Sequence, residues 1–166
     1  YIERSDKNAI MIMAKIIQKL QLEDKVWINN ISGGSSENDI VTFCECVIKT
    51  DIEDIENKIK NNMKEKNLCI QIEKIVIDKA FSLKDSKNII NEIINLNKNN
   101  IITSGNLGVI QTIENKVIIK GILRSLDIEE LQEQNRVNIL ISKSNDFKVE
   151  EVYKDSSWIP NANSKL

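Results

Sequence analysis

The feature that most constrains the fold is a succession of helical and strand patterns that occurs twice along the chain. Apolar residues at helical spacing predict helices, and short β-branched runs predict strands. The first half predicts helix, strand, strand, helix and strand, in that order, over residues 7–22, 26–32, 40–48, 50–66 and 68–78. The second half predicts the same order over residues 83–96, 107–113, 117–123, 127–142 and 147–153.

Local signals mark the ends of several of these elements. Residues 50–53 read Thr-Asp-Ile-Glu, a capping box that predicts a helix start. Asp127 can cap the last helix, and Glu114-Asn115 suits the tight turn of a hairpin. Residues 33–36 read Gly-Gly-Ser-Ser, which predicts a turn after the first strand.

The doubled pattern predicts an α+β fold of the split α/β kind. A ferredoxin-like antiparallel sheet with its helices packed on one face is the expected architecture. The sequence contains one proline and no Gly/Ser-rich linker between the halves. We therefore expect a single domain over residues 1–166, with pseudo-repeat halves of about 1–80 and 81–166.

Composition narrows the functions open to the chain. It has no histidine, the usual general base and the commonest metal ligand, so a catalytic zinc site or a nucleophilic triad is not expected here. The net charge of −2 does not predict a basic surface that binds nucleic acid. No apolar run approaches the roughly 20 residues that a membrane-spanning helix needs. The three cysteines are expected to be free thiols in the cytoplasm. Carboxylate-only chemistry remains open.

Three residues are candidates for ligand binding. Arg124 ends a predicted strand, where its guanidinium could hold a carboxylate or simply form a surface ion pair. Asn38 follows the double-glycine turn, where its amide could reach a ligand or cap the turn. Asn106 lies in a run of small residues, 104–108, that could approach a ligand or form a loop.

Other patterns have plainer interpretations. The Gly-Gly-Ser-Ser segment lacks the lysine and the spacing of a phosphate-binding loop, so a hairpin turn is favoured. Cys44 and Cys46 could begin a soft-metal site, but no third ligand has suitable spacing, which favours core packing. The chain begins at Tyr1 instead of a methionine and stops soon after the Trp-Ile-Pro segment at 158–160, as expected for a piece of a longer protein.

Three segments, in order, resemble a known family. They are Thr-Ser-Gly-Asn-Leu-Gly-Val at 103–109, Ile-Leu-Arg-Ser-Leu at 122–126 and Ser-Trp-Ile-Pro-Asn-Ala-Asn-Ser at 157–164. This succession resembles the lid domain of bacterial aminoacyl-histidine dipeptidases, which belong to the carnosinase-like zinc peptidases. Asn8-Ala9 and the double glycine with Asn38 fit the same family. The chain departs from the family at 37–41, where Glu-Asn-Asp-Ile-Val stands for Arg-Asn-Ala-Ile-Pro.

The resemblance implies a two-domain enzyme in which this chain would be the lid. Two zinc ions would lie in a catalytic domain outside this sequence, and the lid would close over a dipeptide and shield it from water. Arg124 would clamp the substrate carboxylate, and Asn38 would bind substrate or a developing oxyanion. Asn106 and Gly105 are weaker candidates, for which a structural role is favoured. The chain alone would be inactive, and its partners would be its catalytic domain and a second copy in a homodimer.

Two alternatives remain at this point. The chain could be a self-contained binding or dimerisation module that uses its sheet to hold a partner. It could also be the lid of a degenerate dipeptidase relative that has lost its activity.

Overall fold

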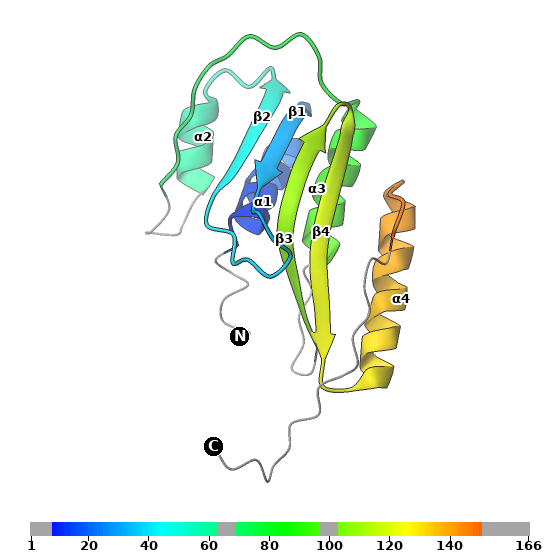
Figure 1. Ribbon diagram of the computed structural model, residues 1–166. Helices are drawn as coiled ribbons and strands as arrows, with labels where there is room; N and C mark the ends of the chain where they lie inside the picture. The colour runs from blue at the N-terminus through cyan, green and yellow to red at the C-terminus, as the bar shows by residue number, and fades with distance from the viewer. Residues whose placement is uncertain (1–7, 63–68, 97–102, 151–166) are drawn as a thin grey trace.

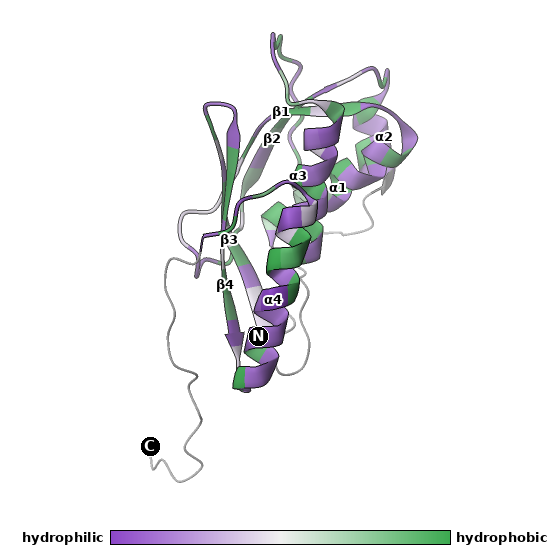
Figure 2. Ribbon diagram, turned by 90° about the vertical axis from the view of Figure 1, so that its right-hand side faces the viewer, coloured by the Kyte–Doolittle hydropathy of each residue, from purple (hydrophilic) through white to green (hydrophobic). Residues whose placement is uncertain are grey.

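The computed structural model describes residues 8–62, 69–96 and 103–150. Figure 1 shows one antiparallel sheet of four strands, in the order β2-β1-β3-β4. Figure 2 shows that the helices lie on one face of this sheet and leave the other face open. The elements, in chain order, are α1 (Ala9–Glu23), β1 (Val26–Gly33), β2 (Cys44–Thr50), α2 (Ile55–Asn62), α3 (Leu83–Leu96), β3 (Thr103–Ile113), β4 (Lys116–Ser125) and α4 (Ile128–Ser144).

This is a mixed α+β fold of the ferredoxin-like kind, as predicted. A helix-strand-strand-helix unit occurs twice, so β1 and β3 form the centre of the sheet and β2 and β4 form its edges. The single-domain assignment stays a prediction. Within the parts of the chain that the structure describes, no helix is long and apolar enough to span a membrane.

The predicted fifth element of each half was wrong within the described residues. Residues 69–78 form no strand, and neither do residues 147–150; residue 68 of the first predicted strand and residues 151–153 of the second lie outside the described residues. β-propensity reflects how well a residue fits a pleated, half-buried surface. The 69–78 segment has no such surface, because Ile75 is 59% exposed and Val76 is 96% exposed.

Two element boundaries also differ from prediction. The strand predicted from residue 40 begins only at Cys44, because the carbonyl of Val41 accepts a hydrogen bond from the Ala9 N–H at the start of α1 (2.8 Å). The capping box was wrong: Thr50 is the last residue of β2, its hydroxyl accepts from the Ile52 N–H (3.3 Å), and α2 starts at Ile55. The predicted cap Asp127 is confirmed and accepts from two backbone N–H groups at the start of α4.

The core lies between the sheet and helices α1 and α3. Its fully buried members are mostly isoleucines from these helices and the two central strands, among them Ile17, Ile28, Ile31, Ile90 and Ile110. A β-bulge interrupts each central strand, between Ile28 and Asn30 in β1 and between Leu107 and Val109 in β3. Because a bulge inserts one residue, the core-facing positions change from even to odd in β1 and from odd to even in β3.

The two halves meet along a short seam between β1 and β3. Only two residue pairs, Ser32–Gln111 and Gly33–Ile110, are in register there. The Thr112 hydroxyl extends the seam, since it accepts from the Ile31 N–H (2.9 Å) and donates to the Ile31 carbonyl (3.2 Å). Further along β1, the Ser86 hydroxyl accepts from the Ile28 N–H (2.9 Å).

The cysteines are free thiols. Cys44 and Cys46 both pack against the core from β2, as expected for residues two apart in a strand. Burial raises the pKa of the Cys44 thiol to about 12 and raises the pKa of Cys46 as well. Cys69 is exposed.

Candidate functional site

The site is built around a short loop, residues 34–39, which leaves β1 and crosses over β3. Gly34 adopts a positive φ of 75°, which favours glycine. A Cβ atom at Gly34 would lie 1.8 Å from the Gly108 carbonyl oxygen, and one at Gly108 would lie 2.1 Å from the Ser36 carbonyl oxygen. The two glycines therefore let the backbone of the 34–39 loop rest directly on the bulge of β3.

Asn106 ties the loop to β3 by its side chain. The Asn106 Nδ2 donates to the Glu37 carbonyl and to the Asp39 carbonyl, both at 2.8 Å. Within the loop, the Asp39 N–H donates to the Ser36 carbonyl (3.0 Å), and the Ser35 hydroxyl donates to the Asp39 carboxylate. The loop is thus shaped by its own turn bonds and attached to the sheet by Asn106.

Arg124 reaches the loop from the edge strand β4. Its Nη2 donates to the Oδ1 of Asn38 over 2.7 Å, although the two residues are 86 positions apart in the sequence. The structure therefore brings together all three residues that the sequence singled out, Arg124, Asn38 and Asn106. Gly105 lies beside them within β3, where it pairs with Leu123.

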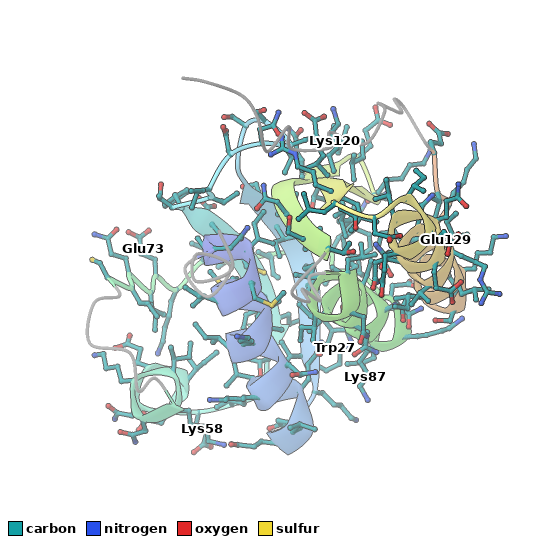
Figure 3. The ribbon with its side chains drawn as sticks, turned by 90° about the horizontal axis from the view of Figure 1, so that it is seen from below. Trp27, Lys58, Glu73, Lys87, Lys120 and Glu129 are labelled. Atoms are coloured by element: carbon teal, nitrogen blue, oxygen red, sulfur yellow. The ribbon has the colours of Figure 1, made fainter. Side chains whose placement is uncertain are left out.

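The site lies at the open face of the sheet. Figure 3, a view from below, places Lys120 of β4 on the face away from the helices. Side chains two and four positions along a strand share a face, so Arg124 projects from the same face as Lys120. Arg124 is paired with Ser104, and Asn106 with Ile122, so all of these residues project from this face.

The arrangement supplies hydrogen-bond donors around one positive charge. A guanidinium carries five N–H bonds, of which Asn38 accepts one, and the Asn38 amide keeps its own two donors. Arg124 and Asn38 are both exposed, so these donors face solvent. A planar anion with two oxygens, such as a carboxylate, matches this set.

Two further observations describe the surroundings of the loop. Among residues 8–62, 69–96 and 103–150, no group of three or more His, Cys, Asp or Glu side chains is placed to hold a metal ion. A shallow hollow lined by residues 34, 35 and 39–43 adjoins the loop, but neither Asn38 nor Arg124 lines it.

The contact that sequence reasoning missed is the attachment of Asn106 to the loop. An asparagine within a strand can donate to any loop that passes over it, and nothing local in the sequence states which loop that is. The one available signal was the pair of glycines, Gly34 and Gly108, because each removes a Cβ where two backbones approach closely.

Comparison with known proteins gives a likeness of fold. No protein-family model and no curated protein matches the chain. Among solved structures, the crystal structure of aminoacylhistidine dipeptidase from Vibrio alginolyticus matches with a TM-score of 0.79 and 19% identity. The match covers 95% of this chain and 37% of that one, so the chain has the fold of about a third of that dipeptidase.

Proposed function

We propose that this chain is the lid of a zinc-dependent dipeptidase that cleaves aminoacyl-histidine dipeptides, and that it grips the carboxylate end of the substrate. The observation that carries the proposal is the meeting of Arg124 with Asn38 at the open sheet face. The shared fold with part of a dipeptidase supports it. The resemblance of the segments at 103–109 and 122–126 to dipeptidase lids supports it as well.

Arg124 supplies the positive charge of the carboxylate grip, by which we mean the Arg124 and Asn38 side chains together. The bond from its Nη2 to Asn38 fixes the plane of the guanidinium and leaves the other N–H groups for the substrate. A carboxylate that binds there receives charge-assisted hydrogen bonds, each of which is worth about 1.5–3 kcal/mol. Asn38 adds amide donors to the same substrate group. The binding energy holds the dipeptide in position while the lid excludes water.

The described residues do not fit a zinc site, so no step of the reaction is assigned to metal held by this chain. The proposal places both zinc ions in a catalytic domain outside this sequence, together with the groups that would cleave the peptide bond. The chain by itself would hydrolyse nothing. Its partners would be that catalytic domain, the dipeptide and a second copy of the lid.

The test is kcat/KM of the full-length parent enzyme on β-alanyl-histidine, with Arg124→Ala compared against the wild type. Loss of the grip should lower kcat/KM roughly 10- to 150-fold with zinc content unchanged. Arg136→Ala is the matched control, because Arg136 is also exposed but pairs with Glu133 on the surface of α4. Equal kcat/KM for Arg124→Ala and the control would refute the assigned role of Arg124.

A second candidate function is a binding or dimerisation module, which the open sheet face favours. Ile113 is 43% exposed and Ile118 is 39% exposed, and both belong to the hairpin of β3 and β4. A wild-type parent that hydrolyses no dipeptide would favour this module. The same result with zinc-ligand residues missing from the flanking sequence would point to the lid of an inactive dipeptidase relative.

A further inference from the structure

We propose that Asn106 is a positioning residue that holds Asn38 against Arg124 and does not itself bind the substrate. This inference rests on the proposed function for its effect on catalysis. Its structural part, the control of the 34–39 loop by Asn106, can be tested without any enzymatic activity.

The first argument is the use of the Asn106 amide. Its Nδ2 donates to the carbonyls of Glu37 and Asp39, which stand on either side of Asn38. A primary amide has two N–H bonds, so two acceptors at 2.8 Å use its whole donor capacity. Asn106 has no donor left for a substrate carboxylate.

The second argument is that the position of Asn38 depends on a contact beyond its own turn. Asn38 is exposed. Within the loop its own N–H makes a long contact of 3.4 Å with the Ser36 hydroxyl, while the Asp39 N–H closes the turn on the Ser36 carbonyl (3.0 Å). The two hydrogen bonds from the Asn106 amide hold the residues immediately before and after Asn38. The backbone of Asn38 is therefore held on both sides, and its side chain is directed toward Arg124.

The third argument is that one strand pair sets both halves of the grip. Arg124 is paired with Ser104, and Asn106 lies two residues further along the same strand, paired with Ile122. The register of β3 and β4 places Arg124 directly, and it places Asn38 through Asn106. The 2.7 Å bond between Arg124 and Asn38 is thus fixed by the hairpin of β3 and β4.

The structural test uses the 166-residue chain and 15N NMR. Asn106→Asp keeps the shape of the side chain but replaces its NH2 group, which holds both donors, by a carboxylate oxygen that faces two carbonyls. Asn106→Ala removes both hydrogen bonds without adding charge. Both variants should lower the heteronuclear NOE of the amides at 37–39. Both should also shift the Arg124 side-chain N–H signal in the direction that Asn38→Ala shifts it. Gln111→Glu, which places a negative charge on an exposed residue of the same strand, should change neither signal.

The catalytic test uses the full-length parent with Asn106→Ala, Asn38→Ala and the double variant. If Asn106 acts through Asn38, the double variant should lose no more kcat/KM than the worse single variant, roughly 10-fold. The loss should appear mainly in KM, because the carboxylate grip is formed in the ground state.

Three results would decide the matter. Unchanged loop NOE values in both Asn106 variants, with native melting temperatures, would overturn the positioning role. Losses that multiply in the double variant would also overturn it, because Asn106 would then act independently of Asn38. A wild-type parent without dipeptidase activity would refute the proposed function alone, and the NMR result would still decide whether Asn106 holds the loop.

Discussion

Replacing Gly34 by alanine should destabilise the protein and displace the loop that carries Asn38. The added Cβ atom would lie 1.8 Å from the carbonyl oxygen of Gly108, and that oxygen belongs to backbone that cannot rotate away. Gly34 also has a φ of 75°, where a side chain is strained. Both effects act in the same direction.

The magnitude follows from these two effects. A left-handed residue other than glycine costs about 1–2 kcal/mol, and forcing extra volume into a packed contact costs about 1–3 kcal/mol. Alanine also reduces the freedom of the unfolded chain, which offsets about 0.4–1 kcal/mol. We expect the free energy of unfolding to fall by roughly 1–4.6 kcal/mol, or the melting temperature by roughly 2–18 °C.

Urea denaturation followed by circular dichroism measures this change, and Thr42→Ala is the control, since Thr42 is an exposed residue a few positions further along. Gly108→Ala should behave like Gly34→Ala, because its Cβ would lie 2.1 Å from the Ser36 carbonyl oxygen. The two substitutions disturb one contact, so their costs should not add in the double variant. A Gly34→Ala protein as stable as the control, with unchanged amide shifts at Gly108, would refute the close approach of the two backbones.

Three further predictions concern the core and the seam. Thr112→Val keeps the side-chain shape but removes both bonds to Ile31, so urea denaturation should show a loss of about 1–3 kcal/mol. Glu92→Ala leaves a buried hydroxyl and a buried amide at the end of α4 without their acceptor, and should cost about 2–5 kcal/mol in the same assay. Burial raises the pKa of the Cys44 thiol from 9.0 to about 12 in the folded state. The contribution of this neutral thiol to the free energy of unfolding should therefore be fully present below pH 9.0 and decline as the pH rises toward about 12. Iodoacetamide at pH 8.5 should accordingly label exposed Cys69 and spare Cys44, as peptide mapping would show.

Much of the fold could be predicted because it depends on local pattern. The isoleucine stripe of α3 and the cap at Asp127 each specify their helix within a few residues. The 69–78 segment has the same β-branched pattern as a true strand, yet forms none. Pairing depends on a partner elsewhere in the chain, and propensity does not contain that information. The capping box at Thr50 failed for a related reason, since β2 extends to that residue.

The sequence allowed us to name the residues of the candidate site, but not their spatial arrangement. The strand end at Arg124 and the glycine turn before Asn38 made each residue a candidate by itself, and the resemblance to dipeptidase lids gave both of them a binding role. Their 2.7 Å contact depends on β3 lying beside β1 and on the loop crossing the bulge, and both are long-range facts. The hydrogen bonds of Asn106 to the loop could not be predicted for the same reason, since the two acceptor residues lie 69 and 67 positions away in the sequence.

The short seam between β1 and β3 has a consequence for how the molecule opens. Each hairpin has a long ladder of its own, whereas two residue pairs and the Thr112 hydroxyl join the hairpins at the seam, and Asn106 and Arg124 join them through the 34–39 loop. Backbone pairing is therefore sparsest at the seam. The amide protons of Ile28 and Ile31, whose acceptors are side-chain hydroxyls, should exchange with solvent sooner than those within the ladder of β3 and β4. Since the 34–39 loop comes from one half and Arg124 from the other, an opening of this seam would also separate Asn38 from Arg124.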